Sequence, residues 1–158
     1  MKTIYLGLGS NLGDREANLR RALAALAPEI NVTKVSPTYE TEPMYVMDQP
    51  KYLNAVCGAT TEISPPNILR KIKETEKEMG EHAHNEPRII DIDLLFYGNE
   101  IVRTPELVIP HPKISERAFV LMPLSDIAPD FVHPVLGSTI AELRDALGEV
   151  SGIQKYEI

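Results

Sequence analysis

The chain has 158 residues, of which 43% are hydrophobic and 25% charged, a composition typical of soluble globular proteins and not of disordered chains. Sixteen Lys and Arg residues against 23 Asp and Glu residues give a formal net charge of -7. This balance argues against a general nucleic-acid binder, because such a protein needs a basic face. Cys57 is the only cysteine, so an intrachain disulfide and a cysteine-based zinc site are both excluded.

The length suits one compact domain, and we expect a single domain over residues 1–158. The sequence has no apolar run that approaches the roughly 20 residues of a membrane span. Its first residues also lack the apolar stretch of a secretory signal. We therefore expect a cytoplasmic protein without a membrane partner or a nucleic-acid partner.

Hydrophobic periodicity and turn residues divide the chain into strands and helices. Asp14 stands at a first expected N-cap, Ser64 and Pro65 open a second helix, and Thr139 and Glu142 have capping-box spacing in the last one. In chain order we predict a strand over 3–8, a helix between 14 and 28, strands over 31–41 and 52–63, a helix over 64–80, a strand over 89–97, irregular structure over 106–115, and helices over 118–124 and 139–147. The order β-α-β-β-α-β predicts an α+β fold, a ferredoxin-like split-βαβ sheet covered by helices.

Asp91 and Asp93 interrupt the apolar strand predicted over 89–97. Side chains alternate between the faces of a strand, so both aspartates share a face, with Cα atoms about 7 Å apart. Two carboxylates at that spacing can share a pair of hard cations, which phosphoryl transfer uses to neutralise a triphosphate. Asp is a poor strand residue, and this favours a metal site over two ordinary solvated aspartates. Arg88 can serve the same site only if the strand begins after it.

Other candidate residues carry charge near this strand in the sequence. Glu76 lies in line with the apolar stripe of the helix over 64–80, where a carboxylate needs a partner. It is either a residue at the edge of the stripe that reaches solvent or an acceptor for a ligand. His111, Lys113 and Arg117 form a cationic group that suits phosphate oxygens.

Tyr52 and Asn54 share the face of another predicted strand, where the tyrosine can stack on a flat ring and the asparagine can pair with its edge. The alternative is ordinary packing at the strand end. Gly7, Gly9 and Gly13 look like a dinucleotide-binding fingerprint, but the third glycine is one place late and the sheet is of the wrong type. We interpret these glycines as turn residues at a sheet edge.

These short motifs follow one another in an order that is specific over nearly the whole chain. They comprise residues 9–13, 39–43, 48–50, 52–54, 87–88, 91–93, 110–111, 117–119 and 123–124. The set resembles the 6-hydroxymethyl-7,8-dihydropterin pyrophosphokinase family of folate biosynthesis. The resemblance implies a monomeric enzyme that transfers the pyrophosphoryl group of ATP to the hydroxymethyl group of the pterin, releases AMP, and uses two Mg²⁺ ions.

The resemblance also implies a role for each matching residue. The expected catalytic residues are Arg88, Asp91 and Asp93, with both aspartates as metal ligands. The expected ATP-binding residues are Glu76, Arg88, His111 and Arg117, with Lys113 added from the cationic group. The expected pterin-binding residues are Thr41, Pro43, Tyr52, Asn54 and Phe119.

The chain departs from the family pattern in two places. Residues 80–87 form a short segment that contains no Arg, Lys or Trp, whereas relatives commonly carry a longer, Arg-rich segment. Pro112 follows His111, where the family often has an aromatic residue. Nucleotide contacts at these two places are therefore expected to differ from the family pattern.

Two other hypotheses use the same residues. One is a different two-metal phosphotransferase or nucleotidyltransferase, which would release ADP or pyrophosphate instead of AMP. The other is a non-catalytic ferredoxin-like binding module, which would show no magnesium-dependent turnover. The presence of Tyr52, Asn54 and Phe119 together with the aspartate pair favours the pyrophosphokinase.

Overall fold

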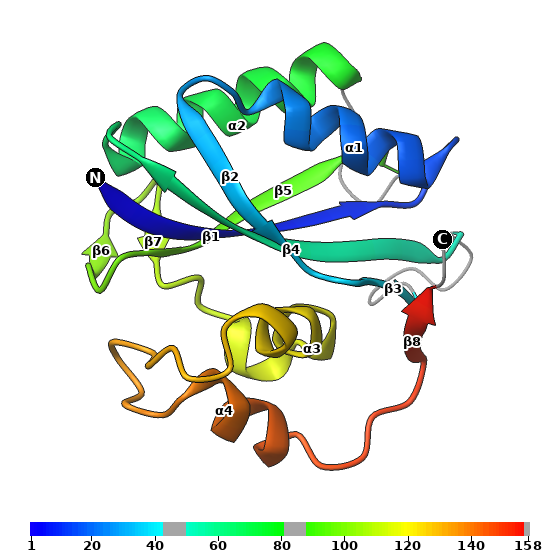
Figure 1. The fold of residues 1–158 in the computed structure, drawn as a ribbon, viewed down its shortest axis with the longest axis vertical. Coiled ribbons are helices and arrows are strands. Elements are labelled where there is room, and N and C mark those ends of the chain that lie inside the picture. The colour runs from blue at the N-terminus through cyan, green and yellow to red at the C-terminus, as the bar shows by residue number, and fades with distance from the viewer. Residues whose placement is uncertain (43–49, 81–87, 157–158) are drawn as a thin grey trace.

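The computed structural model describes residues 1–42, 50–80 and 88–156. Its middle layer is a six-stranded sheet in which every pairing is antiparallel, and helices cover both faces (Figure 1). The strands of this sheet are β1 (Lys2–Ser10), β2 (Ile30–Val35), β3 (Thr38–Thr41), β4 (Tyr52–Thr61), β5 (Asp91–Tyr97) and β8 (Ile153–Tyr156). The remaining elements are α1 (Arg15–Ala25), α2 (Pro65–Met79), the hairpin β6 (Val102–Arg103) and β7 (Val108–Ile109), the 3-10 helix η1 (Ile114–Glu116), α3 (Ala118–Ile127) and α4 (Ile140–Ala146).

The strand order across the sheet is β5-β1-β4-β3-β8, and β2 also pairs with β4. If β2 and β3 are counted as one interrupted strand, the order of the four main strands is that of a split-βαβ fold. The predicted α+β class and ferredoxin-like topology are therefore confirmed. Helices α1 and α2 lie together on one face of the sheet, and α3 and α4 lie on the other (Figure 1).

Two hydrophobic clusters follow from alternation along the strands. Ile4, Leu6 and Leu8 of β1 belong to the cluster beneath α1 and α2. Tyr5 packs with the cluster beneath α3 and α4. Gly7 therefore lies on the α3 side of the sheet, and so does every second residue after it up to the end of the strand.

The single strand predicted over 31–41 is wrong, because the chain breaks between β2 and β3 at Ser36 and Pro37. Ser36 replaces the ladder locally: its N–H donates to the Val56 carbonyl, and its hydroxyl accepts from the Val56 N–H, both at 2.9 Å. Pro37 has no N–H to continue the ladder. The two short strands then pair with different parts of β4.

The interpretation of the N-terminal glycines as turn residues at a sheet edge is wrong for two of them. Gly7 and Gly9 lie inside β1, which is an inner strand between β4 and β5. Gly13 does lie in a turn, with φ of 73°, a conformation that glycine adopts at little cost. Strand β8 and the hairpin β6–β7 were not predicted, and α3 runs three residues beyond the predicted end at residue 124.

The helix caps agree well with the sequence prediction. The Asp14 side chain accepts from the Ala17 N–H, and Thr139 and Glu142 form both bonds of the capping box. Ser64 is the N-cap of α2 but makes no side-chain cap bond. Among the described residues, none of the helices combines the length and the apolar character needed to cross a membrane.

Candidate active site

A row of four residues crosses the sheet on the side that faces α3. The strand registers place Asp91 of β5 opposite Gly9 of β1, Gly9 opposite Asn54 of β4, and Asn54 opposite Tyr39 of β3. Directly opposed residues in antiparallel strands point to the same face. The aspartate segment and the asparagine are therefore separated by one glycine, although they are distant in the sequence.

Gly9 leaves room that its two neighbours on β4 use. A Cβ atom at this position would lie 2.7 Å from Oδ1 of Asn54 and 3.3 Å from Cδ1 of Tyr52. Both side chains therefore lean over β1, toward the strand that carries the aspartates. Asp91 is also close enough to raise the pKa of the Tyr52 phenol, after the larger effect of burial.

Asp91 and Asp93 share the α3 side of β5, as alternation predicts. Asp93 lies opposite Gly7, and the side chains between the aspartates and beyond them, Ile92 and Leu94, belong to the opposite cluster. Burial raises the pKa of both aspartates, and the neighbouring Asp93 carboxylate raises that of Asp91 further. Two partly buried carboxylates that resist ionisation are suited to a cation, which would favour their charged forms.

Arg88 lies just before β5 and outside it, so strand alternation does not direct its side chain away from the aspartates. Its Nη1 is 3.5 Å from Oδ1 of Asp91. The positive charges of Arg88 and Arg117 lower the pKa of both Asp91 and Asp93, opposing the effect of burial. Both arginines therefore belong to the electrostatic environment of the aspartate pair.

Glu76 on α2 has a partner within the protein. Its Oε2 accepts a 2.9 Å hydrogen bond from the N–H of Ile92, on the outer edge of β5. Burial raises the pKa of this carboxyl to about 7, against the lowering effect of the Ile92 bond, and the two aspartates raise it further. A contact between Glu76 and a nucleotide stays a prediction.

The cationic group gathers near the same carboxylates. Burial and the charge of Arg117 lower the pKa of His111, against the effect of Asp91. Nδ1 of His111 accepts a bond from the Lys113 N–H at 3.2 Å, so the neutral ring carries its proton on Nε2, where it can donate. Within the described residues the buried Nε of Arg117 has no hydrogen-bond partner, and the guanidinium lies 5.4 Å from the centre of the Phe119 ring.

The structure describes all of the expected pterin-binding residues except Pro43. Nδ2 of Asn54 donates a 2.7 Å bond to Oγ1 of Thr41, and both residues are buried. Tyr52 is half-buried beside them, and Phe119 lies at the start of α3 next to Arg117. Pro43 lies outside the described residues, as do residues 81–87 of the segment that departs from the family pattern.

The sequence of this chain matches the family described as 7,8-dihydro-6-hydroxymethylpterin-pyrophosphokinase over residues 5–129. That match extends from residue 5, inside β1, to just beyond the end of α3, and it includes all of the expected site residues. The chain belongs to this pyrophosphokinase family. The resemblance stated from the short motifs is therefore confirmed.

Relatives of the pyrophosphokinase family occur alone and within longer proteins. A 2-amino-4-hydroxy-6-hydroxymethyldihydropteridine pyrophosphokinase of Methylorubrum extorquens is 42% identical over 163 aligned positions, 99% of this chain and 100% of that protein. The folic acid synthesis protein FOL1 of Dictyostelium discoideum is 41% identical over 143 residues, which are 89% of this chain but 22% of that protein. The chain thus spans about a fifth of the length of the longer relatives that it matches.

Solved structures agree on the fold of the pyrophosphokinase domain. A crystal structure of Plasmodium falciparum HPPK-DHPS has a TM-score of 0.77 and 19% sequence identity, and covers 92% of this chain and 45% of that chain. At this identity the similarity supports the fold alone. It shows that the antiparallel sheet and its covering helices have the same fold as part of that crystal structure.

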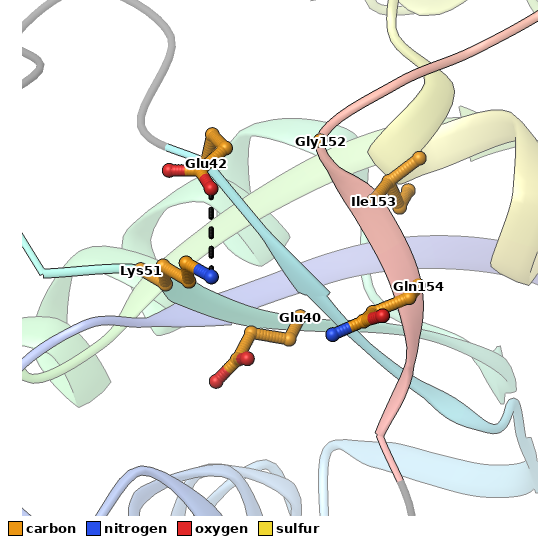
Figure 2. Close-up of a pocket in the computed structure, with 6 residues that line it drawn as sticks. All are labelled: Glu40, Glu42, Lys51, Gly152, Ile153 and Gln154. Atoms are coloured by element: carbon orange, nitrogen blue, oxygen red, sulfur yellow. Dashed lines mark ion pairs between the residues drawn. The ribbon is translucent and has the colours of Figure 1, made fainter.

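A separate hollow of the pyrophosphokinase domain lies where β3 meets β8 (Figure 2). It has a volume of about 200 Å³ and is lined by Glu40, Glu42, Lys51, Gly152, Ile153 and Gln154. Its charges are largely paired, since Lys51 lies 3.5 Å from Glu42 and Arg15 lies 2.8 Å from Glu40. None of the predicted site residues that the structure describes lines it, so we do not take it as the candidate active site.

The space that Gly9 leaves in this candidate site was not predicted from the sequence. Gly7 and Gly9 alternate with buried leucines, and glycine at every second strand position can mark a close approach to another group. That signal was present in the sequence. The sequence alone does not show that β1 lies inside the sheet, so the same glycines also fit turn positions.

Proposed function

We propose that this chain transfers the pyrophosphoryl group of ATP to the hydroxymethyl group of 6-hydroxymethyl-7,8-dihydropterin and releases AMP. The pterin hydroxyl oxygen forms a bond to the β-phosphorus as it loses its proton. The bond between that phosphorus and the oxygen bridging to the α-phosphate breaks. Membership of the pyrophosphokinase family and its relatives in folate synthesis support this proposal.

The observation that carries the proposal is the row Asp91–Gly9–Asn54. It puts a group suited to phosphate-bound cations and a group suited to the edge of a heterocycle on one face, with a glycine between them. Transfer between two bound substrates needs this adjacency, because catalysis without a covalent intermediate depends on alignment and charge neutralisation.

Asp91 and Asp93 would hold two Mg²⁺ ions, which supply neutralisation of the triphosphate charge. Their raised pKa values fit this role, because burial outweighs the opposing charges of Arg88 and Arg117, and a bound cation would stabilise both carboxylates. Within the described residues no group of three His, Cys, Asp or Glu side chains could hold a metal by itself. Mg²⁺ often binds through one or two carboxylates together with substrate phosphates and water, so two aspartates are sufficient.

Arg88, His111 and Arg117 would bind the phosphates, with Lys113 exposed at the rim and Glu76 beside the nucleotide. The Nε of Arg117 has no acceptor among the described residues, and this supports the assignment, because a buried donor without an acceptor costs free energy. A phosphate oxygen would satisfy it. The neutral His111 can donate from Nε2 to the same group of oxygens.

Tyr52 and Phe119 would enclose the pterin ring, while Asn54, Thr41 and Pro43 would bind its edge. The bond from Asn54 to Thr41 uses one amide hydrogen and fixes the amide plane. Its oxygen and its second hydrogen are then available in a defined direction. Such a donor and acceptor pair suits a heterocycle that carries both functions on one edge.

The test is to incubate the chain with ATP, Mg²⁺ and the reduced hydroxymethylpterin and to identify the nucleotide product by chromatography. We expect AMP in equal amount to pterin pyrophosphate. Loss of this product in Asp91→Asn and Asp93→Asn, but not in the control Asp130→Asn on the loop after α3, would support the metal assignment. ADP or pyrophosphate as the product would favour another phosphotransferase or nucleotidyltransferase, and no turnover would favour a binding module.

We also propose a monomer that acts in the cytoplasm. Cys57 is free and buried in the core, which agrees with a reducing compartment. Light scattering during gel filtration measures the mass in solution, and a dimer mass would contradict the first part of this proposal.

A further inference from the structure

Within the described residues, Asn11 connects three segments that are distant in the sequence. It directly follows β1 and is 1% exposed. Its N–H donates to the Arg88 carbonyl at 2.9 Å, and its Oδ1 accepts from the Arg88 N–H at 2.5 Å. Its Nδ2 donates to the Pro50 carbonyl at 3.2 Å.

These bonds need an amide side chain. Arg88 presents an N–H and Pro50 presents a carbonyl, so one end of the Asn11 side chain must accept and the other must donate. A planar amide has one oxygen and one NH₂ group on the same carbon and satisfies both. An aspartate offers only acceptors at neutral pH, and an alanine offers neither.

Each bonded segment leads into one half of the proposed active site. Arg88 precedes β5, and its guanidinium lies 3.5 Å from the Asp91 carboxylate. Pro50 lies two residues before Tyr52, and the next carbonyl, that of Lys51, accepts a 2.9 Å bond from Nη1 of Arg15. Two successive carbonyls are therefore held in place immediately before the ring that would stack on the pterin.

We infer that Asn11 is a positioning residue that fixes the nucleotide half and the pterin half of the site relative to each other. One side chain holds the backbone of Arg88 with its oxygen and the backbone of Pro50 with its nitrogen. This inference rests on the proposed pyrophosphoryl transfer. It adds a role for a residue that would touch neither substrate.

The test compares Asn11→Ala and Asn11→Asp with the matched control Asn18→Ala. Asn18 is another buried amide near the start of α1, but its Nδ2 bonds to Ser10 and Leu12, close in the sequence. For each variant the melting temperature, kcat and both KM values are measured.

Asn11→Ala is expected to raise both KM values and to lower kcat by about a hundred-fold, as small displacements of positioned groups can. Asn11→Asp keeps an acceptor for Arg88 and sets a second oxygen against Pro50. It is therefore expected to raise the pterin KM about ten-fold, a loss comparable to one buried hydrogen bond, while the ATP KM changes less than two-fold. Asn18→Ala is expected to lower the melting temperature and leave both KM values near those of the wild type.

The inference is overturned if Asn11→Ala differs from Asn18→Ala in melting temperature alone. It is also overturned if Asn11→Asp raises the KM for ATP and the KM for the pterin equally. If Asn11→Ala does not fold, the comparison of the two KM values in Asn11→Asp is the test. Absence of AMP with the unmodified chain would overturn the proposed function instead, and this inference with it.

Discussion

The Glu76 carboxylate accepts its 2.9 Å hydrogen bond from the N–H of Ile92, the residue between the two aspartates of β5. Since β5 is an edge strand of the sheet in the part of the chain that the structure describes, this N–H has no neighbouring strand there on its outer side. Glu76 therefore bonds the exposed edge of β5 at the residue that lies between the two proposed metal ligands, Asp91 and Asp93. The carboxylate is held near Asp91 and Asp93, and both raise its pKa.

Glu76→Gln should make the metal-free protein more stable at pH 8 and leave its stability nearly unchanged at pH 4. The folded-state pKa of about 7 lies above the ordinary value of 4.5, so the folded protein binds more protons than the unfolded chain between those values. The contribution of Glu76 to the free energy of unfolding therefore falls as the pH rises from 4.5 to about 7. Glutamine keeps an acceptor for the Ile92 N–H without the charge. We expect the free energy of unfolding to rise by about 1 kcal/mol at pH 8, a value that allows for solvent screening of a partly exposed group.

Urea denaturation at several pH values measures this difference. Glu78→Gln, an exposed glutamate on the same helix, is the control and should leave the pH dependence unaltered. A glutamine variant that is less stable than the wild type at pH 8 would show that the ionised carboxylate is needed to hold β5.

Gly9→Ala should weaken pterin binding by about ten-fold or more, because the new Cβ would lie 2.7 Å from Asn54 Oδ1 and force that amide to move. Asn54 is fixed by its bond to Thr41 and cannot shift without losing it. Gly7→Ala is the matched control on the same strand and face, where the nearest atoms to the new Cβ belong to Leu95, at an ordinary contact distance of 3.7 Å. Titration calorimetry with the pterin measures both, and equal affinities of the two variants would refute the steric argument.

Thr41→Val should weaken pterin binding about five-fold while leaving binding of an ATP analogue unchanged, since it removes the acceptor that orients the Asn54 amide. Thr41→Ser keeps the hydroxyl and should bind the pterin nearly as well as the wild type. The two affinities are measured separately by calorimetry. Parallel losses for pterin and nucleotide would mean that Thr41 supports the whole site and not the pterin edge.

The local parts of the site could be predicted because they depend on alternation within one strand. Asp91 and Asp93 share a face for this reason, and Arg88 approaches them because β5 begins only after it. Helix caps such as Asp14 are equally local. In each case the residues that interact are within a few positions of one another.

The row across the sheet could not be predicted in the same way. Asn54 lies opposite Gly9, and Gly9 lies opposite Asp91, but register between distant strands is set by the packing of both faces and leaves little trace in any one segment. Strand β8 was missed because its two exposed middle residues, Gln154 and Lys155, give it only a weak pattern. Its place beside β3 depends on pairing and not on its own apolar content.

Arg117→Lys should raise the KM for ATP about ten-fold, although the positive charge is kept. Lysine lacks the planar fork of donors of arginine. It also lacks the Nε, which is buried and has no partner among the described residues. Stability should not fall, since the substitution removes a donor whose burial is unfavourable in the free protein. Steady-state kinetics and thermal denaturation measure the two effects, and Arg103→Lys, exposed on β6, is the control. If the variant loses stability but keeps its KM, Arg117 serves the packing against Phe119 and not the binding of phosphate.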